Sequence, residues 1–232
     1  MISSSELCVQ SAINSVIFDF DGVIIDSEPC WHKAKFNVFN EHGILVSDND
    51  ILRTVGKRIE EIVKEYQQTY NFGDAAAKKM TGEIYSQANE GISENAQVIS
   101  GLYGAIDLLL SHNKTLAIAS SSPVNIIISI LKKLQLNDAF SVVYSAESEA
   151  YGKPHPAVYL TAADKLNCNV SNCFVIEDSL NGLISAKAAR MKCVLIDDCG
   201  DKYFNCIADK VIRDLSGINV GLIHELEKHA SR

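Results

Sequence analysis

The sequence predicts an α/β protein built on a doubly wound parallel sheet, and three observations lead to this fold class. After residue 101, short apolar stretches typical of buried strands alternate with stretches that repeat apolar residues at helical spacing. Such alternation gives parallel strands joined by right-handed crossovers, with helices on both faces of the sheet. A further apolar strand is expected near the N-terminus, over residues 15–20, and a long stretch with helical spacing separates it from the others.

The long helical stretch interrupts the sheet and so defines the expected domains. We expect a core domain formed by residues 1–27 and 97–232, and an inserted helical domain formed by residues 28–96. In the insertion, apolar spacing predicts helices over residues 31–42, 59–67 and 75–89, and a short helix from residue 50. In the core we expect helices over residues 102–110, 123–134, 156–166, 180–190 and up to 229, and strands over residues 115–119, 142–144, 174–176, 193–196 and near 211. Residues 1–13 are expected to form a short leader without regular structure.

The composition excludes several classes of partner. The 232 residues carry a net charge of −8, which argues against nucleic acids and anionic membranes as general partners. The apolar runs are too short to cross a membrane, and the first residues do not have the pattern of a signal peptide. The seven cysteines are an odd number without a Cys-x-x-Cys pair, which predicts free thiols in a reducing cytoplasm. We therefore expect a cytoplasmic monomer that acts on a small molecule.

Two carboxylates stand at the end of the first predicted strand. Asp19 and Asp21 are two positions apart, so on an extended strand they point to the same side, and Gly22 then allows a sharp turn. Open α/β sheets bind ligands at the carboxyl ends of their strands. Two acids beside buried residues require a metal, a proton or a cationic ligand. The alternative is an ordinary polar exit from a strand.

Three serines and a lysine are candidates for binding an anion. Ser120, Ser121 and Ser122 follow the strand predicted over residues 115–119, and a helix follows them. Ser122 suits the N-cap and Pro123 the first helical position, and the free N–H groups of such a helix start bind anions. The alternative is a helix start that is merely capped.

Lys153 lies in a Gly-Lys-Pro-His-Pro stretch, where two prolines make the loop stiff. A lysine held in place can neutralise phosphate oxygens, although most lysines simply face solvent. For His155, in the same stretch, the expected role is to cap the helix that follows.

A second pair of acids, Glu177 and Asp178, ends the strand predicted over residues 174–176. Carboxylates at a helix start can be simple caps. Two acidic strand ends with serines and a lysine between them nevertheless suit Mg²⁺, a hard cation that takes oxygen ligands and substrate phosphate.

Each of these four motifs lies at a predicted strand end. Taken together and in this order along the chain, they resemble the motifs of the haloacid dehalogenase superfamily of phosphotransferases. The resemblance covers residues 14–215 and includes the helical insertion, which is similar to the small cap domain of that superfamily. Asp19 and Asp21 match its first motif, Ser120 its second, Lys153 its third, and Glu177 with Asp178 its fourth.

The resemblance can be narrowed to one group of enzymes within this superfamily. The stretches 26–31, 56–59 and 145–147 look like those of sugar-phosphate phosphatases of the 2-deoxyglucose-6-phosphate and hexitol-phosphate type. The β-phosphoglucomutases share the core motifs, but Trp31 stands where they carry a histidine that shuttles protons. That difference weakens the alternative of a phosphosugar mutase.

The resemblance implies an Mg²⁺-dependent phosphatase that hydrolyses small phosphate monoesters, of sugars or sugar alcohols, through an aspartyl-phosphate. It implies that Asp19 is the nucleophile, that Asp21 transfers protons, and that Ser120, Ser121 and Lys153 hold the phosphoryl group. For the metal it implies Asp19, Asp178, the backbone carbonyl of Asp21, and Glu177 as a ligand or as a group that orients the ligands. A non-catalytic binding or regulatory domain on the same fold is a further alternative.

Substrate selection is expected to lie in the insertion, because the core motifs recognise only a phosphoryl group and a metal. Gly56, Lys57 and Arg58 lie between two predicted helices, where a loop can reach the site. Arg58 can offer donors to sugar hydroxyls, and Trp31 can offer an apolar wall. The alternatives are a solvated charge for Arg58 and packing inside the insertion for Trp31.

Overall fold

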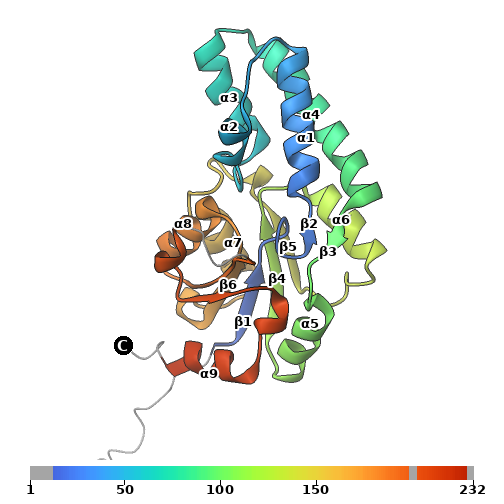
Figure 1. Cartoon of the computed structure of the whole chain (residues 1–232). Coiled ribbons are helices and arrows are strands. Elements are labelled where there is room, and N and C mark those ends of the chain that lie inside the picture. Colours follow the sequence, from blue (N-terminus) through green and yellow to red (C-terminus); the bar gives the residue numbers. More distant parts are fainter. Residues whose placement is uncertain (1–12, 199–202, 229–232) are drawn as a thin grey trace, which may run out of the picture.

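The computed structural model describes residues 13–198 and 203–228 and has a six-stranded parallel sheet at its centre (Figure 1). The strand order is β5-β4-β1-β6-β7-β8, which places the first strand in the middle of the sheet. In register, Ile17 lies beside Ala117 on one side and Val175 on the other. The six strands are β1 (Ser15–Phe18), β4 (Thr115–Ser120), β5 (Val142–Ser145), β6 (Cys173–Glu177), β7 (Lys192–Ile196) and β8 (Lys210–Ile212). The predicted α/β class and the parallel sheet are thus confirmed.

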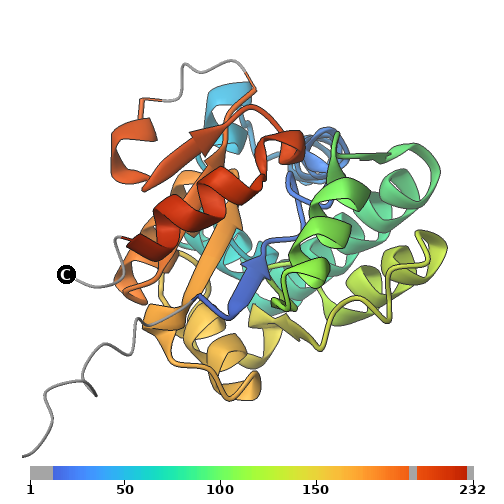
Figure 2. The same cartoon turned by 90° about the horizontal axis from the view of Figure 1, so that it is seen from below.

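Helices cover both faces of the sheet, as Figure 2 shows from below. Alternate strand residues point to opposite faces, so the apolar strands feed two separate clusters of buried side chains. On one face Phe18 and Ile118 pack with α5 (Leu102–Ser111), α6 (Val124–Lys133) and α9 (Val220–Lys228). On the other face Ile17 and Val175 pack with α7 (Ala157–Lys165) and α8 (Leu180–Ala188).

Four helices form the insertion, and they stand at the carboxyl end of the sheet (Figure 1). The chain enters and leaves them through a two-stranded antiparallel ribbon, β2 (Ile25–Asp26) and β3 (Gln97–Val98), in which Ile25 faces Val98. The helices are α1 (Glu28–Glu41), α2 (Asp48–Leu52), α3 (Ile59–Tyr70) and α4 (Asp74–Asn95). Because Ile25 and the buried faces of α1, α3 and α4 belong to the same apolar cluster as Phe18, the insertion is packed continuously with the core.

Local details differ from the sequence-based expectations at a few places. Helix α4 runs on to Asn95, and the short ribbon of β2 and β3 was not predicted, because two-residue strands have no detectable periodicity. The prediction that Ser122 caps the next helix is wrong, since that helix begins at Val124 with Pro123 as its N-cap. His155 does serve the following helix start, because its Nδ1 accepts a hydrogen bond from the N–H of Ala157 over 3.3 Å.

The remaining expectations concern the ends of the chain and the cysteines. The expected leader lies outside the described residues except for Ile13, which is buried. Cys30, Cys168, Cys173, Cys193 and Cys206 are free thiols, and the other two cysteines lie outside the described residues. Within the part of the chain that the structure describes, no helix combines the length and the apolar character needed to span a bilayer.

Candidate active site

The loop after β1 brings the first and the last acidic motifs together. The N–H of Asp19 still donates to the carbonyl of Ile176 over 2.9 Å, so Asp19 leaves the sheet beside the end of β6. Gly22 then adopts φ 72°, and a Cβ at this position would lie 2.1 Å from Oδ2 of Asp178. Only glycine fits this turn, because it tolerates positive φ and has no side chain to collide with the carboxylate.

A buried group of alternating charges lies at the centre of the site. Nζ of Lys153 lies 2.8 Å from Oδ1 of Asp19 and 2.7 Å from Oε1 of Glu177. Asp19, Lys153 and Glu177 are at most 3% exposed. The approach of Lys153 to Asp19 is an ion pair without hydrogen-bond alignment, so Oδ1 of Asp19 has no hydrogen-bond donor of its own. Buried charges are tolerated when they are paired in this way.

Burial and pairing shift the titration of these groups in different directions. Burial raises the pKa of Asp19 to about 7, although the Lys153 ammonium acts to lower it. For Lys153, burial favours the neutral amine, but the carboxylates of Asp19 and Glu177 outweigh it and raise the pKa above its usual range. For Glu177, burial acts to raise the pKa, but the charge and hydrogen bond of Lys153 lower it below its usual range. Of these three groups, Asp19 is therefore the one whose ionised form the protein alone stabilises least.

Glu177 is fully occupied by hydrogen bonds from the protein. Its Oε1 accepts from Lys153 and from the hydroxyl of Tyr159, over 2.7 and 2.6 Å. Its Oε2 accepts from the N–H groups of Asp178 and Ser179 and from the Ser179 hydroxyl, each over 3.0 Å. These bonds fix Glu177 as the residue that orients Lys153 and the start of α8. Sequence reasoning missed Tyr159, and no local motif marks it.

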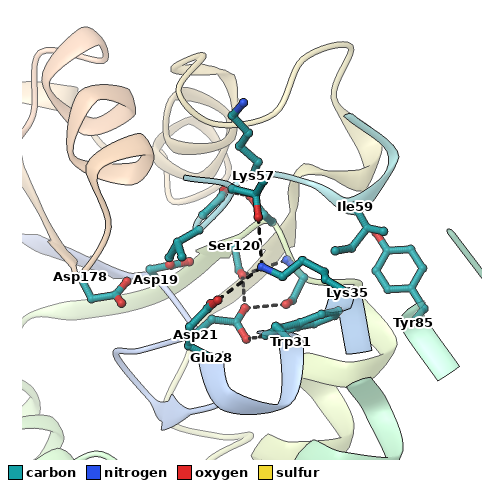
Figure 3. A pocket seen from close by; sticks show the side chains of 15 residues that line it. Asp19, Asp21, Glu28, Trp31, Lys35, Lys57, Ile59, Tyr85, Ser120 and Asp178 are labelled. Atoms are coloured by element: carbon teal, nitrogen blue, oxygen red, sulfur yellow. Dashed lines mark hydrogen bonds and ion pairs between the residues drawn. The ribbon is translucent and has the colours of Figure 1, made fainter. Parts of the chain in front are cut away.

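Asp21 accepts hydrogen bonds from side chains that come from both the core and the insertion (Figure 3). Its Oδ1 accepts from the Ser27 hydroxyl over 2.5 Å and from Nε1 of Trp31 over 2.7 Å. Its Oδ2 accepts from the hydroxyls of Ser122 over 2.5 Å and Ser120 over 3.4 Å. Ser122 therefore orients a carboxylate instead of capping a helix.

A cavity lies between the strand ends and the insertion. From the core it is lined by Asp19, Asp21, Ser120, Ser121, Ser122 and Asp178, so most of the predicted site residues meet in one place. The insertion contributes Glu28, Trp31, Lys35, Thr54, Val55, Gly56, Lys57, Ile59 and Tyr85. The cavity therefore extends from the strand ends of the core to a second end formed by α1 and the loop between α2 and α3.

The residues predicted to select the substrate do not all face the cavity. Trp31 lines the cavity and stacks edge-on against Tyr85, with ring centroids 6.0 Å apart. The Gly56 carbonyl accepts from the Ser121 hydroxyl over 2.7 Å, which ties the loop to the core. Lys57 points its ammonium away from the cavity (Figure 3) and pairs it with Glu65 over 2.7 Å.

Arg58 lies outside the cavity lining. Its Nη1 donates to the carbonyls of Ala146 and Glu149 over 2.9 and 2.8 Å, and its Nη2 donates to Glu61 over 2.6 Å. In this arrangement the guanidinium fastens the insertion to the core instead of facing a ligand.

The acidic strand ends fit a hard divalent cation. Carboxylate oxygens of Asp19, Glu177 and Asp178 lie within 4.8 Å of one another. Oxygen donors of this kind suit Mg²⁺. Glu177 belongs to this group by distance, but its two oxygens already accept five hydrogen bonds, so Asp19 and Asp178 are the better candidates. The carboxylate of Asp21 is not part of this group.

Comparison with known proteins identifies the family. The model of the haloacid dehalogenase-like hydrolases matches residues 16–196. The chain belongs to the haloacid dehalogenase-like hydrolase family. Within this family it is 33% identical over 185 residues to hexitol phosphatase B of Escherichia coli strain K12, a match that covers 79% of this chain and 83% of that protein.

Two further proteins are similar to this chain over most of its length. The 6-phosphogluconate phosphatase of Escherichia coli strain K12 is 28% identical over 184 residues, covering 78% of this chain and 81% of that protein. The crystal structure of β-phosphoglucomutase from Clostridium difficile superposes with a TM-score of 0.82 at 26% identity, covering 94% of this chain and 98% of that one. Like its named phosphatase relatives, this haloacid dehalogenase-like hydrolase is an enzyme of the phosphatase type.

Proposed function

We propose that this enzyme is an Mg²⁺-dependent phosphatase that hydrolyses phosphate monoesters of sugars or sugar alcohols through an aspartyl-phosphate. The observation that carries the proposal is the position of Asp19. It lies at the carboxyl end of the central strand, 2.8 Å from the ammonium of Lys153, and it lines the cavity together with Asp178. The hexitol phosphatase and the 6-phosphogluconate phosphatase among its relatives support the substrate class.

The reaction takes place in two displacements at phosphorus. A carboxylate oxygen of Asp19 forms a bond to phosphorus, the bond to the leaving oxygen breaks, and Asp21 gives that oxygen a proton. Water then forms a bond to phosphorus, gives a proton to Asp21, and releases Asp19 with inorganic phosphate. Dividing one difficult step into two easier ones is the advantage of covalent catalysis.

The surrounding residues bind and orient the phosphoryl group. Lys153 neutralises its oxygens as a buried point charge, and the Ser120 hydroxyl, whose bond to Asp21 is long at 3.4 Å, turns to donate to them. Ser121, whose hydroxyl donates to the Gly56 carbonyl, contributes its backbone N–H. Glu177 holds Lys153 in place through the 2.7 Å ion pair. Mg²⁺, held by Asp19, Asp178 and the backbone carbonyl of Asp21, would supply further charge neutralisation at the same oxygens.

The domain organisation follows from the same proposal. Residues 28–96 form a cap domain over the core made by residues 1–27 and 97–232. The cap closes the cavity against water and brings α1 and the loop around Gly56 to the leaving group. Arg58, through the carbonyls of Ala146 and Glu149, helps to hold the cap in the closed position.

A phosphosugar mutase is the second candidate, because β-phosphoglucomutase shares the fold. Trp31 argues against it. Its indole donates to Asp21 but cannot titrate, so it does not shuttle protons as a histidine can. His32 is the adjacent histidine, and its Nε2 lies 3.2 Å from Asp48, a residue that does not line the cavity.

The experiment measures phosphate release from p-nitrophenyl phosphate and from a panel of sugar and sugar-alcohol phosphates, with Mg²⁺ and with chelator. We expect Mg²⁺-dependent release by the wild type and none by Asp19→Asn, which should remain folded in a thermal melt. Turnover by purified Asp19→Asn, or full activity in chelator, contradicts the proposal. Conversion of β-glucose 1-phosphate into glucose 6-phosphate without phosphate release would favour the mutase.

A further inference from the structure

Lys35 is a buried lysine inside the cap part of the cavity. It lies on α1, one turn after Trp31, and is 2% exposed. Lysines are almost never buried this deeply unless they are paired. Lys35 lines the cavity but plays no part in the proposed chemistry at phosphorus. Its position therefore calls for another role.

Two polar partners hold the Lys35 ammonium. Nζ lies 3.3 Å from Oε1 of Glu28 and 3.2 Å from the hydroxyl oxygen of Thr54. Thr54 donates its own hydroxyl hydrogen to the Ile51 carbonyl over 2.6 Å, so its oxygen is oriented to accept from Lys35. All three side chains line the cavity, and Figure 3 shows Lys35 and Glu28 meeting beside Asp21 and Trp31.

We propose that Lys35, Glu28 and Thr54 form the subsite for the leaving group, and that this subsite selects uncharged polyhydroxy groups over groups that carry a carboxylate. This inference rests on the proposed phosphatase function. It names which of the related substrate classes, neutral polyol phosphates or aldonate phosphates, the chain acts on.

The chemistry of the three side chains matches that of a sugar hydroxyl. An ammonium has three donors, and two of those of Lys35 point to Glu28 and Thr54, which leaves one for a ligand. The Glu28 carboxylate has acceptor sites to spare. A hydroxyl both donates and accepts, so it can bind Lys35 and Glu28 at the same time. Neighbouring hydroxyls on a polyol extend the same pattern to Thr54.

The charges in the cavity disfavour an anionic leaving group. The positive charge of Lys35 is already matched by Glu28, and the carboxylate of Asp21 lies close by (Figure 3). Lys57, the second lysine that lines the cavity, directs its ammonium to Glu65 outside it. A carboxylate on the leaving group would thus meet two acidic side chains and no unmatched cation among the described residues that line this end of the cavity.

The test compares three substrates: sorbitol 6-phosphate as a neutral polyol ester, 6-phosphogluconate as an aldonate ester, and p-nitrophenyl phosphate, which has no hydroxyls. We expect the wild type to favour sorbitol 6-phosphate over 6-phosphogluconate in kcat/KM. Glu28→Gln leaves the Lys35 charge unmatched, so we expect the ratio of aldonate to polyol kcat/KM to rise about tenfold, the scale of one charge-assisted hydrogen bond.

Lys35→Met should lower the ratio of polyol to aryl kcat/KM by about tenfold, because the aryl ester has no hydroxyl to lose. If the unpaired Glu28 prevents folding of this variant, the double variant Glu28→Gln, Lys35→Met removes both charges and is expected to show the same loss. The matched control is Lys79→Met, which removes a lysine on α4 that is 66% exposed and 3.6 Å from its partner Glu83. We expect it to change none of the three rates.

The outcomes distinguish failure of the phosphatase proposal from failure of the proposed leaving-group subsite. Absence of aryl phosphate turnover by the wild type would overturn the phosphatase proposal itself. With that turnover intact, a wild type that favours 6-phosphogluconate, or a Glu28→Gln variant with an unchanged ratio, would overturn the proposed subsite. Equal losses on all three substrates in the Lys35 variants would assign the three residues to folding of the cap and also overturn it.

Discussion

Nε1 of Trp31 donates a hydrogen bond to Oδ1 of Asp21 over 2.7 Å, and this bond joins the first cap helix directly to the proposed proton-transfer residue. The indole is 6% exposed, so the bond is shielded from water. Trp31, which the sequence predicted to offer an apolar wall, thus presents a hydrogen-bond donor to this carboxylate.

Trp31→Phe should lower kcat on every phosphate ester while changing KM little. Phenylalanine keeps an aromatic ring against Tyr85 but cannot donate to Asp21. Hydrogen bonds to charged groups contribute about 1.5–3 kcal/mol, and Ser27 and Ser122 still hold the carboxylate, so we expect a loss of roughly 10-fold. Steady-state kinetics on p-nitrophenyl phosphate and a sugar phosphate measure it. A folded variant with wild-type kcat would show that the bond does not orient Asp21 for proton transfer.

Asp19 should make the metal-free protein less stable as the pH rises. Its pKa of about 7 in the folded protein lies above the ordinary 3.8, so the folded state binds more protons than the unfolded state between these values. The contribution of this group to the free energy of unfolding is thus fully present below about pH 4 and lost as the pH rises through about 7.

Asp19→Asn removes this titration and provides the control. In chelator, we expect the melting temperature of the wild type to fall more than that of Asp19→Asn as the pH is raised from about 5 to about 8. Added Mg²⁺ should raise the melting temperature of the wild type more than that of the variant. Parallel melting curves for the two proteins across this pH range would contradict the shifted pKa.

Asp178→Ala should raise the Mg²⁺ concentration needed for half-maximal activity. Asp178 is one of the three carboxylates whose oxygens lie within 4.8 Å of one another, and Glu177 in that group is saturated by hydrogen bonds. Removing one of two carboxylate ligands should weaken metal binding by about tenfold or more. A titration of phosphatase activity against Mg²⁺ measures the shift, and an unchanged titration curve would exclude Asp178 from the metal site.

Arg58→Ala should reduce kcat/KM for sugar phosphates and aryl phosphates alike. The guanidinium donates to the carbonyls of Ala146 and Glu149 in the core, so its loss weakens cap closure for any substrate. We expect a loss of about tenfold on both, the scale of a hydrogen bond to a charged group. Lys57→Met is the neighbouring control, because that ammonium already points out to Glu65. A loss confined to sugar phosphates would instead support the role predicted from the sequence, in which Arg58 donates hydrogen bonds to substrate hydroxyls.

The sequence was sufficient to predict the parallel sheet and the polar residues at the ends of its strands. Apolar strands buried on both faces are easy to recognise; Asp19 and Asp178 each follow such a strand directly, and Ser120 is the last residue of one. Since parallel strands end at the same edge, the topology itself gathers these residues, and no distance information is needed.

The rest of the site depends on tertiary contacts between segments that lie far apart in the sequence, which local patterns do not encode. Ser122 has the sequence context of an N-cap, yet its hydroxyl bonds to Asp21, a residue 101 positions away. The bond from Tyr159 to Glu177 depends on how α7 packs on the sheet, and the contact between Lys35 and Thr54 depends on how α1 meets the loop after α2. Each residue type is ordinary in its own segment, so only the tertiary arrangement shows its role.

The loop between α2 and α3 is fastened to the core through its main chain, because the carbonyls of Gly56 and Val55 accept from Ser121 and Asn181, each over 2.7 Å. Main-chain acceptors stay in place when side chains change. The side chains of Val55 and Lys57 are consequently free to vary without loss of these attachments. A library randomised at Val55, which lines the cavity, would change the wall of the cavity while the loop kept its docked conformation, which makes this position a natural starting point for directed evolution toward new esters.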